Sequence, residues 1–234
     1  AAAASTPAVE ATDSPRSLVV LDVDPTWTTA AHGAALGVVA PGEELANRFP
    51  DLGSATFLVN LLAPGALASI AWLRAAGSTA AAWGCLSRPG TDRVLPLGQV
   101  ESIGLPLDPE AILRSLRRHS TKGARVITAG ADVDALMSLR QALTREGMSV
   151  SMAWDASQAT DLIAMVRPKV VIVDLDLPPR AGYGVVAGLS GATPVPLMIL
   201  IAGRGDAASG FGAALADPAN TSKTIPRRGL VEQL

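Results

Sequence analysis

The amino-acid sequence predicts an α/β protein made of two doubly wound, parallel-sheet domains in tandem. Strand and helix patterns alternate along the chain, several strands are continuous hydrophobic runs, and the alternation begins a second time after about residue 120. Continuous apolar strands are typical of parallel sheets that helices cover on both faces. We therefore expect one (βα)5 domain over 15–119 and another over 125–234, joined by a short linker at 120–124.

The composition is that of a chain with a sizeable hydrophobic core. Of the 234 residues, 49% are hydrophobic and 17% are charged, and the formal net charge is -2. This balance argues against a disordered chain and leaves no basic field that would attract nucleic acid. The single cysteine, Cys85, excludes an internal disulfide and a cysteine-based zinc site. These totals fit a reducing cytoplasm.

The first half opens with a linker, 1–14, that lacks the basic start and apolar core of a signal peptide. Gly77 predicts the end of one helix, and Asp108 with Pro109 predicts the start of the next, because aspartate caps free N–H groups and proline suits the first helical position. Hydrophobic runs predict strands at 17–21, 55–60, 78–86 and 101–107, and helical spacing predicts helices at 26–36, 67–77 and 107–119.

The second half repeats this alternation. Gly147 and Pro168 predict the ends of its first two helices. The last helix begins at Arg227 and is short or truncated. The patterns predict strands at 124–130, 148–154, 169–174, 195–203 and 221–226, and helices at 132–147, 155–168 and 227–234.

Two uncharged stretches, 52–73 and 181–203, have the length of a membrane span. Pro64 and Gly65 interrupt the first, and several glycines and prolines interrupt the second. Each stretch therefore predicts two buried elements joined by a turn, and we expect no membrane insertion.

The segment VVIVDLDLPPRAG resembles the phosphoacceptor segment in the receiver domains of two-component response regulators. In that family a buried strand ends in an aspartate, here Asp174, with a proline four positions later and a glycine eight positions later. Pro178 and Gly182 match both spacings. The resemblance implies a flavodoxin-like fold, and it implies that Asp174 accepts phosphate from a histidine kinase with the help of Mg²⁺.

The family's other site residues are replaced in this half. Gly130 and Ala131 stand where the family has an acidic pair, and Asp132 is the next acid. Ile201 stands at the hydroxyl position, and Ile225-Pro226 stands where the family has a lysine before a proline. Because Mg²⁺ needs several oxygen ligands, these replacements remove the metal partners of the phosphoacceptor.

Two interpretations of Asp174 follow. In the first it is a relic, a solvated acid at a strand end or a cap for the following turn. In the second it is still a phosphoacceptor, and only then do we expect Mg²⁺ as a cofactor.

The first half resembles the same family more faintly. The segment VVLDVDP keeps Asp22 of the acidic pair, and Asp24 follows two positions later. Asn60 occupies the phosphoacceptor position, where an amide cannot form an aspartyl phosphate. Leu105-Pro106 stands at the lysine-proline position, and Ser87 is the candidate hydroxyl.

The leading hypothesis is a regulatory pair of degenerate receivers, similar to those of a hybrid sensor histidine kinase. Such a fragment is not itself an enzyme and acts by binding a histidine kinase core, another signalling protein or a second copy of itself. A second hypothesis is a pseudo-receiver that binds a nucleotide second messenger through Arg88, Arg93 and Arg204. A third is phosphate acceptance at Asp174. Neither end carries a basic helix, so we expect no DNA-binding output.

Overall fold

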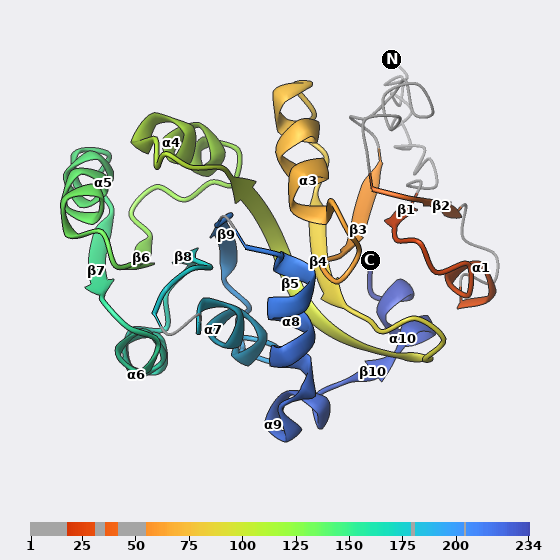
Figure 1. Ribbon diagram of the computed structural model, residues 1–234. Helices are drawn as coiled ribbons and strands as arrows, with labels where there is room; N and C mark the ends of the chain where they lie inside the picture. The colour runs from red at the N-terminus through yellow and green to blue at the C-terminus, as the bar shows by residue number, and fades with distance from the viewer. Residues whose placement is uncertain (1–17, 31–35, 42–54, 179–180, 204) are drawn as a thin grey trace, which may run out of the picture.

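The computed structural model describes residues 18–30, 36–41, 55–178, 181–203 and 205–234 (Figure 1). Ten strands form one sheet in the order β2-β1-β3-β4-β5-β9-β8-β6-β7, and β10 pairs with β5 beside this path. The strand pairs are parallel except β4 with β5 and β10 with β5. The predicted α/β class is confirmed: helices alternate with a mostly parallel sheet in a flavodoxin-like arrangement. Within the described ranges, no helix is both long and apolar enough to cross a membrane.

The elements of the first half follow the predicted order, except that β2 is an additional strand. Two predictions are corrected. Within the expected helix 26–36 the described residues Trp27–Ala30 are helical, but Leu36 begins a strand that pairs with β1 in parallel. The strand expected over 101–107 instead runs over Arg93–Ile103. The linker 1–14 and the ranges 31–35 and 42–54 lie outside the described residues. The elements are β1 Leu18–Leu21, α1 Trp27–Ala30, β2 Leu36–Val39, β3 Thr56–Asn60, α3 Ala66–Ala75, β4 Ala82–Leu86, β5 Arg93–Ile103 and α4 Pro109–Arg117.

The second half contains the predicted strands and helices, with three further helices in its described residues, α7 before β9 and α8 and α9 after it. Asp108 caps α4 as expected, and Asp132 and Asp155 likewise cap the helices that follow them. The elements are β6 Arg125–Ala129, α5 Val133–Arg145, β7 Ser149–Ala153, α6 Ala156–Val166, β8 Val170–Asp174, α7 Gly182–Gly188, β9 Leu197–Ile201, α8 Ala207–Ala216, α9 Pro218–Thr221, β10 Ile225–Pro226 and α10 Arg227–Val231.

The two halves exchange their last strands. The early part of β5 pairs with β4 in antiparallel fashion, and its last residues, 100–103, pair in parallel with β9 of the second half. The order β7-β6-β8-β9-β5 thus gives the second half a fifth strand from the first half. In return, β10 from the second half pairs with Val94 and Arg93. The sequence predicts two separate parallel sheets, and the structure joins them into one mixed sheet through β5.

A glycine explains how β5 changes partners. Gly98 has φ 94, a left-handed conformation that favours glycine, and it lies opposite Gly84, where the β4–β5 register shifts. A Cβ at Gly98 would lie 2.5 Å from Cγ1 of Val195. The strand therefore bends here and continues alongside β9. That 15–119 and 125–234 fold as separate domains stays a prediction.

One hydrophobic cluster runs through both halves on the same face of the sheet. It joins Val19 and Phe57 of the first half to Val171 and Met198 of the second, and α3, α6, α7 and α8 contribute to it. The other face is covered in two parts. Helices α4 and α5 pack over β6, β8 and β9, and α1 and α10 pack over β1 and β3. Each exchanged strand is therefore followed by a helix that packs on the other half.

Candidate functional site

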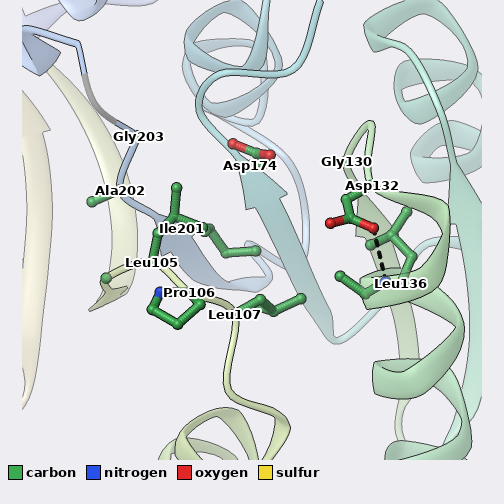
Figure 2. A pocket seen from close by; sticks show the side chains of 12 residues that line it. Leu105, Pro106, Leu107, Gly130, Asp132, Leu136, Asp174, Ile201, Ala202 and Gly203 are labelled. Carbon is green, nitrogen blue, oxygen red and sulfur yellow. Dashed lines mark hydrogen bonds between the residues drawn. The ribbon is translucent and has the colours of Figure 1, made fainter.

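Asp174 ends β8 at the edge of a cavity of about 820 Å³ (Figure 2). Its side chain is half-buried. The cavity lies at the carboxyl ends of β5, β6, β8 and β9, where ligands bind in open α/β sheets. Its lining consists of Gly104, Leu105, Pro106, Leu107, Gly130, Asp132, Ala135, Leu136, Asp174, Ile201, Ala202 and Gly203.

The turn after Asp174 explains the glycine of the sequence pattern. A Cβ at Gly182 would lie 2.4 Å from the carbonyl oxygen of Asp174 and 2.9 Å from Cα of Leu175. Only glycine lets the start of α7 lie this close to the strand end. The carbonyl oxygen of Asp174 accepts a hydrogen bond from the backbone N–H of Leu177 at 3.1 Å, one residue before the exposed Pro178. The matching glycine is thus required by this turn whether or not Asp174 is chemically active.

Burial raises the pKa of the Asp174 carboxyl, and the negative charge of Asp176 raises it further. A hydrogen bond from the backbone N–H of Asp176 to Oδ1 of Asp174, at 2.9 Å, partly offsets both effects. The other lining acid, Asp132, accepts a hydrogen bond from the N–H of Ala135 at 3.0 Å and so caps α5. No lysine or arginine is among the described residues that line the cavity.

The two residue pairs that stand at the family's lysine-proline position each lie in the other half from the one expected. Leu105-Pro106, expected at the site of the first half, lines the Asp174 cavity because β5 pairs with β9. Ile225-Pro226, expected near Asp174, pairs with Val94 and Arg93 instead. Lys223 donates a hydrogen bond to the carbonyl oxygen of Gly188 at 3.0 Å. Both corrections follow from the strand exchange.

Two further residues that the sequence predicts for the site around Asp174 line the same cavity. Gly130 and Ile201 line it, at the positions where the family has an acid and a hydroxyl. Neither side chain is a metal ligand or a hydrogen-bond donor. Asp174 thus faces apolar walls at the positions where the resemblance requires polar partners.

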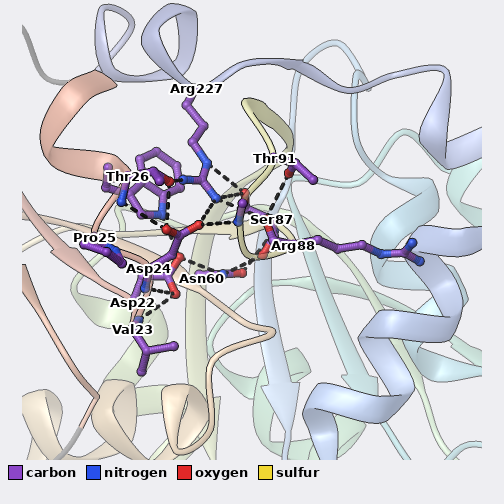
Figure 3. A network of polar contacts seen from close by, with 12 residues as sticks. Asp22, Val23, Asp24, Pro25, Thr26, Asn60, Ser87, Arg88, Thr91 and Arg227 are labelled. Carbon is purple, nitrogen blue, oxygen red and sulfur yellow. Dashed lines mark hydrogen bonds and ion pairs between the residues drawn. The ribbon is translucent and has the colours of Figure 1, made fainter.

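The predicted residues of the first half meet in a buried polar network (Figure 3). Asn60 donates hydrogen bonds through Nδ2 to Oδ2 of Asp22 and to the carbonyl oxygen of Ser87, both at 2.8 Å. The indole N–H of Trp27 donates to the same Asp22 oxygen at 2.6 Å. Oδ1 of Asp22 accepts from the backbone N–H groups of Val23 and Asp24. Both oxygens of Asp22 are therefore occupied by donors from this chain.

Asp24 has a cationic partner from the far end of the chain. Nη2 of Arg227 lies 2.8 Å from Oδ2 of Asp24, and the backbone N–H of Gly90 donates to the same oxygen at 3.0 Å. Oδ1 accepts from the backbone and the hydroxyl of Thr26. Burial opposes the charge of Asp24, but the hydrogen bonds from Thr26, Arg227 and Gly90 outweigh it and lower the pKa of this carboxyl.

Arg227 closes the network. Its Nε and Nη2 donate to Oγ of Ser87 at 3.0 and 2.8 Å, and its Nη1 donates to Oγ1 of Thr26. Its guanidinium lies over the ring of Trp27, 4.5 Å from the centroid, and its side chain is 1% exposed. The guanidinium thus occupies the space beside Asp24 and Ser87.

Sequence reasoning missed both Arg227 and Trp27. Arg227 is 203 residues from Asp24 in the chain. The available signal was an arginine directly after Ile225-Pro226, the pair that stands at the family's lysine-proline position. Using this signal requires knowing that β10 pairs with β5 of the first half, because that pairing brings Arg227 to Asp24.

The residues present do not fit the Mg²⁺ ion that the family resemblance implies. In the first half, the carboxylates of Asp22 and Asp24 already accept hydrogen bonds from this chain, and Arg227 supplies the positive charge. At Asp174 the neighbouring acid, Asp132, caps a helix. Among the described residues there is no group of three His, Cys, Asp or Glu side chains able to hold a metal ion.

The arginines considered for nucleotide binding have other contacts. Arg88 donates to the carbonyl oxygen of Gly212 at 3.4 Å, and Arg93 donates to Oγ1 of Thr224 at 3.1 Å. Arg204 lies outside the described residues. The two described arginines therefore hold segments of the second half against the first.

Part of the chain is similar in sequence to response regulators. A stretch of 79 residues is 35% identical to response regulator MprA of Mycolicibacterium vanbaalenii and equally identical to MprA of Mycobacterium sp. strain KMS. The match covers 33% of this chain, and the chain spans about a third of the length of these curated relatives, 34%. No protein-family model matches the chain. Among solved structures, full-length ShkA in complex with AMPPNP overlaps with 86% of this chain and 50% of its own, at 17% identity and a TM-score of 0.31. On the sequence match, this chain contains a receiver-like region.

Proposed function

We propose that this chain is a regulatory module of a two-component signalling protein, in which two degenerate receivers act by binding a protein partner instead of transferring phosphate. The observation that carries the proposal is the guanidinium of Arg227, which occupies the acidic site of the first half. A site whose carboxylates and hydroxyl are already bonded within the chain has no room for a phosphoryl group and its metal ion.

The Asp174 cavity supports the same proposal. Phosphoryl transfer depends almost entirely on positioning and on neutralising the charge of the phosphoryl oxygens. At this cavity Leu105 stands at the lysine position and Ile201 at the hydroxyl position. A raised pKa at Asp174 further lowers the fraction of carboxylate available at a given pH.

The proposed partner is a histidine kinase core or another signalling protein, in the cytoplasm, and the module itself has no enzymatic activity. The similarity to response regulators over 79 residues supports this class of partner. The shared strand β5 gives the module a means of regulation, because its end lies beside the Asp174 cavity while its start pairs with β10. Binding at one half therefore acts on an element that belongs to both.

An NMR titration with Mg²⁺ and beryllofluoride, a mimic of aspartyl phosphate, tests the proposal. We expect amide signals around Asp174 to stay in place at millimolar Mg²⁺, both in the wild type and in Asp174→Asn. Shifts around Asp174 in the wild type alone would establish a working phosphoacceptor and would overturn the proposal for the second half.

A further inference from the structure

A second cavity, of about 340 Å³, lies between α3 and α4 over the last part of β5. Three arginines line it: Arg74 from α3, Arg114 from α4, and Arg118 at the end of α4. One acid, Glu101, is among the lining residues, so the lining is formally cationic. Apart from Gly104, this cavity shares no lining residue with the Asp174 cavity, and it contains no residue of the Arg227 network.

Glu101 holds two of the arginines in place. It is 1% exposed, and its Oε2 accepts hydrogen bonds from Nε of Arg74 at 2.8 Å and from Nη2 of Arg118 at 3.1 Å. Its Oε1 lies 2.8 Å from Nε2 of His119. Because three basic side chains cover both carboxylate oxygens, Glu101 anchors the cationic groups and presents little negative charge to the cavity.

The arginines differ in how they are held. Nη1 of Arg74 donates to the carbonyl oxygens of Ser78 and Ala80, so its side chain is fixed and only 10% exposed. Arg114 is 62% exposed, and its Nη2 lies 3.5 Å from Oδ2 of the exposed Asp108. The cavity therefore has a fixed cationic wall and an exposed cationic rim.

Ser115 lines the cavity, and its buried hydroxyl has no partner among the described residues. Ser115 is 2% exposed, and its Oγ makes no hydrogen bond with any described residue. A buried hydroxyl without a partner is unfavourable, and such groups in native proteins call for an explanation. A ligand that accepts a hydrogen bond from this hydroxyl would supply one.

We propose that the cavity binds an oxyanion of the phosphate class, through the guanidinium groups of Arg114 and Arg118 and the hydroxyl of Ser115. Guanidinium groups pair well with phosphate oxygens, and a serine hydroxyl donates one further bond. The volume is at the lower end of small-molecule sites, which suits phosphate itself or a small phosphorylated metabolite. The inference is independent of the proposed function, because it uses no receiver residue.

Isothermal titration with inorganic phosphate tests the site, with ionic strength held constant by NaCl so that general screening does not change. We expect saturable binding to the whole chain, weakened about tenfold or more in Arg114→Gln or Arg118→Gln, which corresponds to the loss of one charge-assisted hydrogen bond. Arg117→Gln is the matched control. It removes the same charge from the same helix, but Arg117 pairs with Glu146 at 3.0 Å and does not line the cavity.

A second variant separates binding from stability. Ser115→Ala should weaken phosphate binding without lowering the melting temperature, because it removes a hydroxyl that has no partner among the described residues. A parallel titration with adenosine monophosphate distinguishes the ligand sources: tighter binding than phosphate means that the site takes a nucleotide, and equal binding means that phosphate alone is recognised. The proposal is wrong if binding does not saturate, or if Arg117→Gln and Arg114→Gln lose the same affinity.

Discussion

At the scale of single residues, Arg227 determines the character of the acidic site in the first half. It is a buried cation that contacts one carboxylate, two hydroxyls and one aromatic ring, on Asp24, Ser87, Thr26 and Trp27. Its charge balances that of Asp24, while Asn60 and Trp27 satisfy Asp22 with neutral donors. This acidic site therefore holds a structural ion pair.

Replacing Arg227 by alanine should therefore be severely destabilising. The change leaves Asp24 buried without its cation, a loss of about 3–5 kcal/mol for a broken buried pair. Urea denaturation followed by circular dichroism measures the difference. Arg228→Ala is the control: its pair with Glu232 is exposed, so a change within about 0.5 kcal/mol is expected. Equal losses of unfolding free energy in the two variants would mean that the buried network stabilises the protein no more than an exposed ion pair does.

Glu101 gives a pH dependence whose sign follows from its contacts. Burial opposes its charge, but hydrogen bonds and attraction from His119, Arg74 and Arg118 lower its pKa from the ordinary value of 4.5 to about 2. Because the folded state binds this proton more weakly than the unfolded state, the stabilisation is complete above pH 4.5 and is lost as the pH falls to about 2.

The free energy of unfolding, measured by urea denaturation between about pH 2 and pH 7, should fall on acidification through this window. In Glu101→Gln the slope should be smaller: the variant is less stable near neutral pH, where Arg74 and Arg118 lose their counter-ion, and the difference from the wild type narrows as the pH falls to about 2. An unchanged slope in this variant would assign the acid sensitivity to other carboxylates.

At the scale of elements, the sheet depends on the shape of β5, the strand that joins the two halves. It pairs with β4, β9 and β10, and it changes from an antiparallel to a parallel partner near Gly98. The positive φ at this residue and the close approach of Val195 both exclude a side chain.

Gly98→Ala should consequently destabilise the protein by about 1–3 kcal/mol, since it adds backbone strain and a contact with Val195 that is too short. Gly104→Ala, one residue beyond β5, is the control. A Cβ there would meet no described atom within 4 Å apart from its own chain neighbours, so a much smaller change is expected. Thermal denaturation of both variants makes the comparison, and similar melting temperatures would show that β5 tolerates a side chain at its bend.

Local signals account for the elements that the sequence predicts well. Asp108 with Pro109 marks the start of α4, and the apolar run before Asp174 marks β8. The incorrect end of the helix 26–36 shows the limit of such signals, because pairing with β1 makes Leu36 part of a strand. Of the site, the sequence predicts which residues stand at strand ends. Their partners depend on contacts that cross the whole chain, as Arg227 with Asp24 does.

At the scale of the whole molecule, the exchange makes each half depend on the other. The second half obtains its fifth strand and the helix α4 from the first, and the first half obtains β10 and α10 from the second. A hydrophobic cluster on one face of the sheet joins both. Cooperative unfolding of the entire chain follows, because neither half can lose its structure without exposing core residues of the other.

Fragments 1–119 and 120–234 test this dependence. Each fragment alone should give a poorly dispersed NMR spectrum. The first lacks the segment that carries Arg227, and the second lacks β5, the strand that pairs with β9. Mixed in equal amounts, they should restore the spectrum of the whole chain. The same mixture with Arg227→Ala in the second fragment should associate more weakly, whereas Arg228→Ala should not. Well-dispersed spectra of the separate fragments would instead establish two autonomous domains, with the boundary that the sequence predicts, and would make the exchanged strands an addition to folds that are already complete.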